Sequence, residues 1–251
     1  MNTIAVIQAR MGSTRLPGKV MLPLDGKHVL ERDIERVSRA ESINKTVVAT
    51  SVSTADDIVE RYAAQCGATV YRGSEPDVLG RMYNAATEVS ADVVVRITGD
   101  CPLISPQGID AVVHRLQESD VDYVSNTVKQ TLPRGLDVEA FTYESFSTVE
   151  RRAKSREERE HVTLHYLRNQ DEFDIGNVSD EEIFDAPHLH GRDDLRLTLD
   201  EADDYELLRR IYEEMPTDEP LEIEDVVTVI DEKGWAGINQ NIQQKHPPEP
   251  E

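Results

Sequence analysis

Short apolar runs alternate with amphipathic segments through the first half of this chain. The first run, Ile4–Ala9, precedes a helical pattern over His28–Ala40 and a second run at Thr46–Ser51. Such runs are typical of strands buried on both faces, and strands joined by helices pair in parallel through right-handed crossovers. The alternation therefore predicts a three-layer α/β/α fold with a mostly parallel central sheet. The further elements predicted in this half are helix Ile58–Cys66, strand Ala68–Tyr71, helix Asp77–Val89, strand Asp92–Thr98, helix Pro106–Glu118 and strand Val121–Ser125.

The second half is less regular, but the whole chain fits one domain. A length of 251 residues suits a single generous α/β domain, which we assign to residues 1–240. The proline-rich, charged end over 241–251 is expected to be a flexible tail. Thr54 and Asp57 predict a helix-capping box in the first half. The elements predicted in the second half are strand Leu136–Phe141, helices Ser145–Ala153 and Glu158–Arg168, strand Asp194–Leu199, and helices Ala202–Met215 and Ile223–Lys233.

A cationic loop follows the first predicted strand directly. It reads Gln8-Ala9-Arg10-Met11-Gly12-Ser13-Thr14-Arg15-Leu16-Pro17-Gly18-Lys19. Open α/β sheets bind ligands at the carboxyl ends of their strands, so the loop is expected at the binding edge. Arg10, Arg15 and Lys19 suit the oxygens of a triphosphate, and Gly12 and Ser13 offer close backbone approach and a hydroxyl. The loop lacks the Gly-Lys-Ser/Thr ending of a Walker motif, and an ordinary basic turn is the alternative.

Two aspartates stand at the ends of predicted strands. Asp100 follows the valine-rich strand by two residues, and Asp200 closes the run that begins at Leu195. Carboxylates at the same sheet edge as a phosphate loop suit Mg²⁺, which prefers oxygen ligands and shares phosphate oxygens. Asp100 also fits a turn before Pro102, and Asp200 also fits a helix N-cap. A neighbouring acid could replace Asp200 as the metal ligand, so that choice stays open.

The cationic loop resembles the CMP-sugar synthetase, or cytidylyltransferase, superfamily, in which a strand is followed by AR-x-x-S-x-RLPGK. The chain is closer still to the spore-coat polysaccharide biosynthesis cytidylyltransferase branch, through Gly73–Arg81, Pro133–Glu139 and Arg159–Thr163. The resemblance runs from about Ile4 to Asn239. It implies the nucleotide-diphospho-sugar transferase fold, which is Rossmann-like and similar to the GT-A fold.

The resemblance implies a Mg²⁺-dependent enzyme in which a sugar hydroxyl attacks the α-phosphorus of CTP and expels pyrophosphate. It implies Asp100 and Asp200 as metal ligands, although Glu201 and Ala202 depart from the family's V-D-T-x-x-D segment. The catalytic residues implied are Arg10, Arg15, Lys19 and Asp100. The nucleotide-binding residues implied are Gln8, Ala9, Arg10, Gly12, Ser13, Arg15, Lys19, Arg72 and Arg81. The product would be a CMP-sugar, made from an acidic or modified sugar for surface polysaccharide or glycan biosynthesis.

The middle of the chain carries the candidate sugar-binding residues. Arg134 stands in a predicted turn and suits a sugar carboxylate, while Asp137 and Glu139 suit sugar hydroxyls or a second metal. Arg159 and His161 lie on a predicted helix and are further substrate-binding candidates. A solvated turn is the alternative for the first three residues, and a packed or surface histidine is the alternative for His161.

The charge balance excludes several classes of partner. With 49 acidic and 27 basic residues, the formal net charge is −22, which opposes general binding to nucleic acid or anionic membranes. The opening run Ile4–Ile7 is too short for a signal peptide or a membrane span, so a cytoplasmic location is expected. The expected partners are CTP and a sugar. Family members often pair through the middle of the chain, so residues 127–180 are expected to serve sugar binding and homodimerisation.

Two other functions remain open at this point. A glycosyltransferase would consume a nucleotide sugar on a similar sheet, but it is expected to carry a paired-aspartate metal motif where Thr98–Pro102 has one aspartate. A non-catalytic nucleotide-sugar binding protein is the second alternative. The presence of both the phosphate cations and the carboxylates argues against that alternative. The sequence does not identify the sugar.

The acidic, lysine-poor composition predicts a halophilic protein. Salt screens the repulsion among surface carboxylates, so the folded state gains most from added salt when net charge is large. We expect the free energy of unfolding, measured by urea denaturation, to rise between low and molar KCl. A protein that is fully folded and active without added salt would contradict this prediction.

Overall fold

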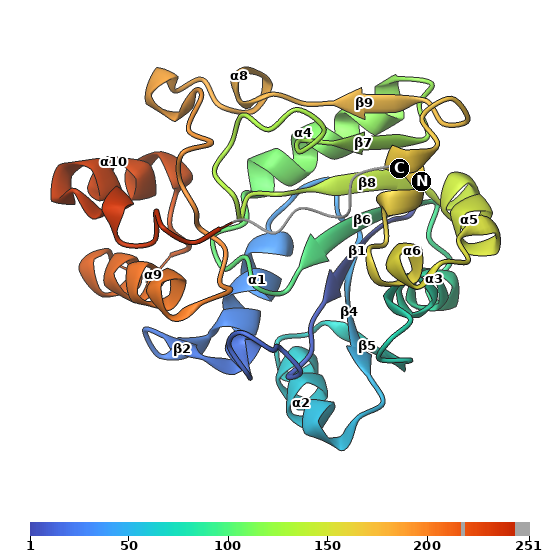
Figure 1. Ribbon diagram of the computed structural model, residues 1–251, viewed down its shortest axis with the longest axis horizontal. Coiled ribbons are helices and arrows are strands. Elements are labelled where there is room, and N and C mark those ends of the chain that lie inside the picture. The colour runs from blue at the N-terminus through green and yellow to red at the C-terminus, as the bar shows by residue number, and fades with distance from the viewer. Residues whose placement is uncertain (217–218, 244–251) are drawn as a thin grey trace.

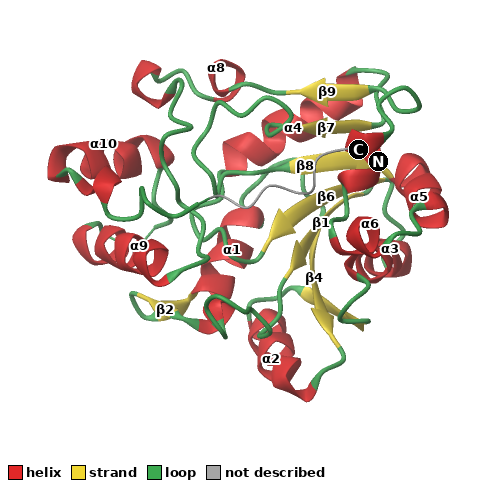
Figure 2. Cartoon of the chain, in the orientation of Figure 1, coloured by secondary structure: helices red, strands yellow, loops and turns green. Residues whose placement is uncertain are grey.

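The fold is built on one seven-stranded sheet, described in a computed structural model for residues 1–216 and 219–243. Its strands are β1 (Thr3–Gln8), β4 (Lys45–Ser51), β5 (Thr69–Gly73), β6 (Val93–Thr98), β7 (Tyr123–Ser125), β8 (Glu139–Thr142) and β9 (Ile175–Asn177). The strand order is β5-β4-β1-β6-β8-β7-β9. Figure 1 shows this sheet crossing the molecule with helices on both of its sides, and Figure 2 shows the same view by element type.

The sheet is mostly parallel, as the alternation of strands and helices predicts. β1 pairs in parallel with β4 and β6, and β4 pairs in parallel with β5. Within the described sheet, β8 alone runs against its neighbours β6 and β7, and β9 is parallel to β7. The prediction of an α/β fold with a mostly parallel sheet is confirmed. The loops that follow β1 and β6 consequently meet at one edge.

Helices cover both faces because the strand residues alternate between two hydrophobic clusters. The helices are α1 (Val29–Val37), α2 (Asp57–Gln65), α3 (Val78–Glu88), α4 (Pro106–Glu118), α5 (Tyr143–Arg152), α6 (Arg156–Glu160), α7 (Leu164–Arg168), α8 (Asp180–Ile183), α9 (Ala202–Glu214) and α10 (Ile223–Lys233). In β1, Ala5 and Ile7 pack in the cluster with α1, α2 and α4, whereas Ile4 and Val6 pack with α3, α5 and α7. Burial of both faces explains why the apolar runs are unbroken.

A third cluster packs α9 and α10 against an extended segment. The alternate leucines of the predicted strand Asp194–Leu199 are buried in this cluster. The prediction of a strand is wrong, because in the described chain this segment forms a single bridge, between Arg196 and Arg134, and joins no sheet. Its alternating pattern reflects packing against helices instead of pairing with a neighbouring strand. The segment nevertheless delivers Asp200 to the edge of the sheet.

Gly135 allows the central turn to approach this extended segment. Its φ is +102°, and a Cβ built there would lie 2.5 Å from the Leu197 carbonyl carbon and the Thr198 nitrogen. Arg134 completes the contact by donating its N–H to the Leu195 carbonyl at 3.1 Å. Only glycine combines this backbone angle with this close approach.

The predicted helix Glu158–Arg168 is also wrong, because it is broken into α6 and α7. The break begins at His161, whose φ of −101° and ψ of 84° end α6. Val162 is fully buried, and the Thr163 hydroxyl donates to a Glu139 carboxylate oxygen at 2.6 Å. These two contacts turn the chain inward, so His161 lies in a turn instead of on a helix.

Other differences concern short elements and caps. Four short elements leave no periodic pattern in the sequence. They are β2 (Pro23–Leu24) and β3 (Lys27–His28), which form a hairpin, together with β9 and α8. The predicted capping box is wrong, because Ser53 caps a 3₁₀ turn over Thr54–Asp56 and α2 begins only at Asp57. β8 starts three residues later than predicted, because the chain is irregular after the Gly135 turn.

The end of the chain is only partly described. Of the expected tail over 241–251, residues 244–251 lie outside the described residues, so its flexibility stays a prediction. Among the helices of the described ranges, none has the length and apolar character needed to span a bilayer.

We predict that Gly135→Ala lowers the free energy of unfolding by about 2 kcal/mol or more, because a positive φ and a backbone clash both oppose the added methyl group. Urea unfolding followed by circular dichroism measures the loss. Gly191→Ala is the matched control, since its φ is +67° but nothing lies within 4 Å of an added Cβ. This control should lose only about 1 kcal/mol. Equal losses in the two variants would show that the contact with Leu197 is unimportant.

Candidate active site

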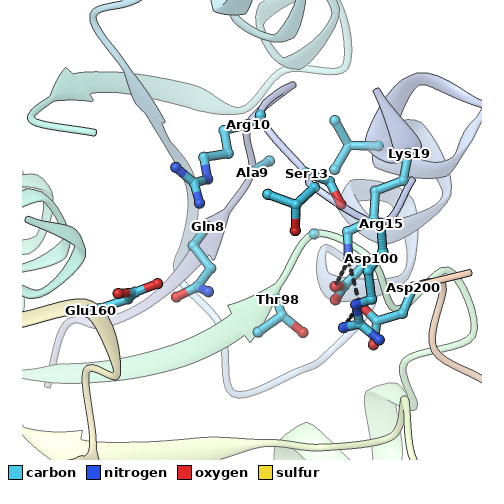
Figure 3. Close-up of a pocket in the computed structure, with 14 residues that line it drawn as sticks. Gln8, Ala9, Arg10, Ser13, Arg15, Lys19, Thr98, Asp100, Glu160 and Asp200 are labelled. Atoms are coloured by element: carbon cyan, nitrogen blue, oxygen red, sulfur yellow. Dashed lines mark hydrogen bonds and ion pairs between the residues drawn. The ribbon is translucent and has the colours of Figure 1, made fainter. Parts of the chain in front are cut away.

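The loop after β1 forms one wall of a pocket at the carboxyl edge of the sheet (Figure 3). The pocket has a volume of about 330 Å³. Its other walls come from the end of β6, from the last residue of α6 and from Asp200. The lining residues are Gln8, Ala9, Arg10, Gly12, Ser13, Thr14, Arg15, Lys19, Val20, Thr98, Gly99, Asp100, Glu160 and Asp200.

Two groups of side chains occupy opposite ends of this pocket in Figure 3. The first group, the charge cluster, consists of Arg15, Lys19, Asp100 and Asp200. The second group, the amide end, consists of Gln8, Arg10 and Glu160. The pocket therefore has the charge cluster at one end and an amide, a guanidinium and a carboxylate at the other.

Lys19 lies between two aspartates in the charge cluster. Its Nζ is 2.5 Å from Oδ2 of Asp100 and 2.8 Å from Oδ1 of Asp200. Arg15 contacts the same Asp200 oxygen at 2.9 Å, and Arg196 contacts the other Asp200 oxygen at 2.6 Å. Three cations thus surround one carboxylate that comes from the far end of the chain.

The charges in this cluster shift the pKa values of their neighbours. Burial alone would lower the pKa of Lys19, but Asp100 and Asp200 outweigh it, so that pKa lies above its ordinary value. Burial alone would raise the pKa of Asp200, but Lys19, Arg15 and Arg196 hold that pKa below its ordinary value. Both groups are therefore charged at neutral pH.

Close backbone contacts bring the aspartates to the loop. Gly99 donates its N–H to the Gln8 carbonyl at 2.9 Å, and a Cβ at Gly99 would lie 2.9 Å from the Ala9 side chain. The end of β6 is thereby held against the end of β1. Leu199 donates its N–H to the Asp100 carbonyl at 2.8 Å, which places Asp200 beside Asp100.

The loop itself is held in a fixed shape. The N–H of Gly18 donates to the Met11 carbonyl at 3.0 Å and closes the loop. The N–H of Met11 donates to a carboxylate oxygen of buried Asp56 at 2.7 Å, which anchors the loop beside the end of β4. The cations of the loop are consequently presented from a rigid turn.

The donor set of the charge cluster fits a magnesium ion shared with a nucleotide. Among the described residues, no three His, Cys, Asp or Glu side chains form a metal-binding group. Asp100 and Asp200 supply carboxylate oxygens on either side of Lys19. Mg²⁺ is commonly held by one or two carboxylates together with phosphate oxygens and water. Two aspartates therefore suit that ion when a nucleotide supplies the other ligands.

A second pocket, of about 340 Å³, adjoins the first and shares Thr98, Asp100 and Asp200 with it. The predicted sugar-binding residues Arg134, Asp137, Glu139 and His161 all line this second pocket. Its remaining lining residues are Arg96, Cys101, Thr127, Thr163, Leu164, Leu167 and Thr198. A ligand in each pocket would meet the other at the three shared residues.

Glu139 is engaged by the protein itself. Its carboxylate accepts hydrogen bonds from the Tyr123 hydroxyl at 2.7 Å and the Thr163 hydroxyl at 2.6 Å, and it pairs with Arg96. Burial alone would raise the pKa of Glu139, but Arg96 and the two hydroxyls lower it below its ordinary value. This network orders the floor of the second pocket, so the geometry favours a positioning role for Glu139.

Asp137 is the freer carboxylate of the second pocket. Its Oδ2 is 3.4 Å from Arg134, whereas its Oδ1 is buried and has no hydrogen-bond partner among the described residues. Burial raises the pKa of Asp137 despite the nearby Arg134. An unpaired buried acceptor is costly, so a hydroxyl donor from a ligand would relieve this cost.

Three predicted binding residues do not line either pocket. Arg72 contacts Asp57 and Glu60 of α2, each at 2.7 Å. Arg81 is buried and donates to backbone carbonyls of the loop after β5. Arg159 binds both carboxylate oxygens of Asp77 and so joins α6 to α3. Direct contacts of these arginines with substrates stay predictions, and their observed contacts are structural.

Sequence reasoning missed several lining residues. Arg96 interrupts the apolar run of β6, and a lone charge in such a run indicates a residue with a specific role. This indication could have been used to find it. Thr98 stands at the end of the same strand. No sequence pattern marks Glu160 or Thr163 as a lining residue. Glu160 is one acid in a strongly acidic chain, and Thr163 follows a helix break that the sequence did not predict.

Comparison with known proteins gives a consistent result. The sequence model described as cytidylyltransferase matches residues 4–224. An uncharacterized protein of Methanocaldococcus jannaschii is 34% identical over 246 residues, covering 98% of this chain and 97% of that protein. The spore coat polysaccharide biosynthesis protein SpsF of Bacillus subtilis is 34% identical over 233 residues, covering 90% and 92%. A solved cytidylyltransferase structure from Leptospira borgpetersenii superposes with a TM-score of 0.87 at 31% identity, covering 98% and 100%.

Glu158 links the start of α6 to His165 of α7 and so holds the chain around Glu160 and His161, which leads to a prediction on pH. Burial would raise the pKa of Glu158, but hydrogen bonds from His165 and Ser155 lower it from 4.5 to about 2. A lowered carboxyl pKa stabilises the fold above the unfolded value and loses this effect as pH falls toward the folded value.

We predict that Glu158→Gln lowers the free energy of unfolding by about 1–2 kcal/mol at pH 7. Its stability should fall less than that of the wild type between about pH 4.5 and pH 2. Urea titrations at several pH values measure both effects. Glu157→Gln, on the exposed side of α6, is the control and should follow the wild-type profile. Parallel profiles for wild type and Glu158→Gln would refute this prediction.

Proposed function

Because the chain belongs to the cytidylyltransferase family, we propose that it transfers CMP from CTP to a sugar hydroxyl with the help of Mg²⁺. In this reaction the hydroxyl oxygen bonds to the α-phosphorus and the α–β phosphoanhydride bond breaks. Pyrophosphate leaves with the electron pair of that bond, and the hydroxyl proton passes to solvent water. The observation that carries the proposal is the contact of Lys19 with Asp100 and Asp200 at one end of the pocket.

The cations of the loop are proposed to bind the triphosphate. Lys19 and Arg15 stand in the charge cluster, and Arg10 lies at the amide end of the same pocket. A guanidinium binds two phosphate oxygens at once, and an ammonium group neutralises charge at a point. Stabilising the charge that develops on the leaving pyrophosphate is the main contribution expected of such groups.

Asp100 and Asp200 are proposed to hold the metal. When bound, Mg²⁺ would screen the charge of the phosphates and stabilise the charge that develops in line. The two aspartates bind Lys19 in the described structure, and that residue would turn toward the phosphates as nucleotide and metal arrive. This exchange keeps every charge of the cluster paired before and after binding.

The second pocket is proposed to hold the sugar. Because it meets the nucleotide pocket at Thr98, Asp100 and Asp200, a sugar hydroxyl there would face the α-phosphate. Arg134 and Asp137 supply a donor and an acceptor for the sugar, and His161 lies at the same pocket. These contacts suit an acidic or otherwise modified sugar, and the CMP-sugar is proposed to serve polysaccharide or glycan biosynthesis. We propose a homodimer formed through residues 127–180.

The proposed function predicts that Lys19→Ala and Asp100→Ala each reduce kcat/KM for CTP on the order of a hundredfold, because each removes charge stabilisation at the phosphates. Both variants should remain folded by circular dichroism. Lys27→Ala is a matched control, because its ammonium group pairs with Glu35 outside both pockets. CTP turnover at the wild-type rate in either site variant would refute the assignment.

A substrate matrix tests the activity itself. Four nucleoside triphosphates are incubated with a panel of acidic, amino and neutral sugars, with Mg²⁺ and high KCl, and pyrophosphate release is followed. The proposal expects release with CTP and one class of sugar, which is lost when EDTA removes the metal. Release with UTP alone, or nucleotide-sugar consumption without pyrophosphate, would favour a different transferase.

A further inference from the structure

The segment that follows α10 returns to the residues that support Asp200. Gly234 ends α10 with a left-handed φ of +67°, and a 3₁₀ turn over Trp235–Gly237 comes next. Ile238 then packs against the hydrophobic cluster of α9 and α10, and Asn239 beside it is buried. A buried side-chain amide requires hydrogen-bond partners, and those of Asn239 belong to the support of Asp200.

The centre of this support is Asp204, a carboxylate in the first turn of α9 that is fully buried. Its Oδ2 accepts the backbone N–H groups of Asp200 at 2.9 Å and of Glu201 at 3.0 Å. Its Oδ1 accepts from Nε of Arg196 and from Nδ2 of Asn239, each at 2.9 Å. These donors offset the cost of burying the charge, and they fix the backbone of Asp200.

Arg196 extends the support from the backbone of Asp200 to its side chain. Nη2 of Arg196 donates to Oδ2 of Asp200 at 2.6 Å. The other oxygen, Oδ1, faces Lys19 at 2.8 Å and Arg15 at 2.9 Å (Figure 3). The two oxygens of Asp200 therefore have separate partners. Because Arg196 keeps Oδ2, the oxygen that can exchange its cations for a metal is Oδ1.

Asn239 ties the two parts of this support together. Its Nδ2 donates to the backbone carbonyl of Arg196 at 2.9 Å as well as to the carboxylate of Asp204. Both partners can only accept, so the amide nitrogen must face them. An apolar side chain at this position would withdraw a donor from two buried acceptors, which is costly. The extended segment that carries Arg196 would then lose one of its ties to α9.

We propose that Asn239 is a positioning residue for the metal. Through Asp204 and Arg196 it keeps Oδ1 of Asp200 turned toward the nucleotide pocket. This inference rests on the proposed function, in which Asp200 binds Mg²⁺. Replacing a residue that orients metal ligands commonly weakens metal binding by roughly ten- to a hundredfold. The segment after α10 thus serves the active site without touching a substrate.

Calorimetry with CTP tests this proposal without knowledge of the sugar. The dissociation constant of CTP is measured with Mn²⁺ and again in EDTA, and the ratio of the two values gives the gain in affinity that the metal supplies. Asn239→Leu should reduce this gain about tenfold or more. Its affinity for CTP in EDTA should stay close to that of the wild type, because the cations of the loop are unchanged.

Asn241→Leu is the matched control for this substitution. It removes the same amide two residues further along, where the side chain is exposed and has no hydrogen bond in the described part of the chain. Its gain from Mn²⁺ should equal that of the wild type. Asn239→Ser keeps a shorter donor and should lose about threefold of the gain, so it carries the test if the leucine variant does not fold by circular dichroism.

A double-mutant cycle separates positioning from a general loss of structure. In Asp200→Asn the metal has already lost the ligand that Asn239 is proposed to orient, so adding Asn239→Leu should cause little further loss of the gain. A full gain in both Asn239 variants, equal losses with Mn²⁺ and in EDTA, or additive losses in the cycle would overturn the inference and leave the proposed function standing. Wild-type binding of CTP that does not depend on Mn²⁺ would contradict the proposed function itself.

Discussion

The shared ion pair of Lys19 with Asp100 and Asp200 is the interaction on which the site depends. The lysine and its partners are 81 and 181 residues apart in the sequence, so this one ammonium group joins the first loop, the end of β6 and the segment before α9. Two partly buried carboxylates would repel one another without a cation between them. The fold therefore keeps a positive charge at this position, and a nucleotide-bound metal could take it over without leaving either carboxylate unpaired.

A second network links the two pockets. Arg96 pairs with Glu139 in the second pocket and donates to Gln8 in the first, while the hydroxyls of Tyr123 and Thr163 donate to Glu139. Buried polar networks of this kind specify a single arrangement when every member is satisfied. The same residues thus order the floor of the second pocket and orient the Gln8 amide in the first pocket. The two pockets consequently share one rigid support.

The regular part of the fold could be predicted because local signals and tertiary structure agree there. The hydrophobic pattern alone predicts strands buried on both faces, and the residue types alone predict a cationic binding loop after Ile4–Ala9. The strand predicted at Asp194–Leu199 failed because alternating leucines pack equally well against helices. The continuous helix predicted over Glu158–Arg168 failed at His161. The break there is caused by a contact with a distant residue, Glu139, which no local pattern records.

The candidate site was predictable where charge opposed the composition of the chain. Arg15 and Lys19 stood out for that reason, Asp100 stood out because it follows a predicted strand by two residues, and the three residues lie together. Arg72 and Arg159 were expected at the site through the family resemblance, yet each pairs with acids of the protein, because an acidic chain offers many structural partners for an arginine. Glu160 could not be singled out, since its relevance comes only from the direction in which α6 ends. The salt dependence expected from the composition remains a prediction about solution behaviour.

The most direct measurement of the central claim is a crystal structure grown with CTP and Mn²⁺, in which anomalous scattering locates the metal. The account predicts one metal peak within about 2.0–2.4 Å of carboxylate oxygens from both Asp100 and Asp200, with Lys19 moved onto the phosphates. A triphosphate bound elsewhere, or a Lys19 that still bridges the two aspartates beside bound CTP, would contradict it.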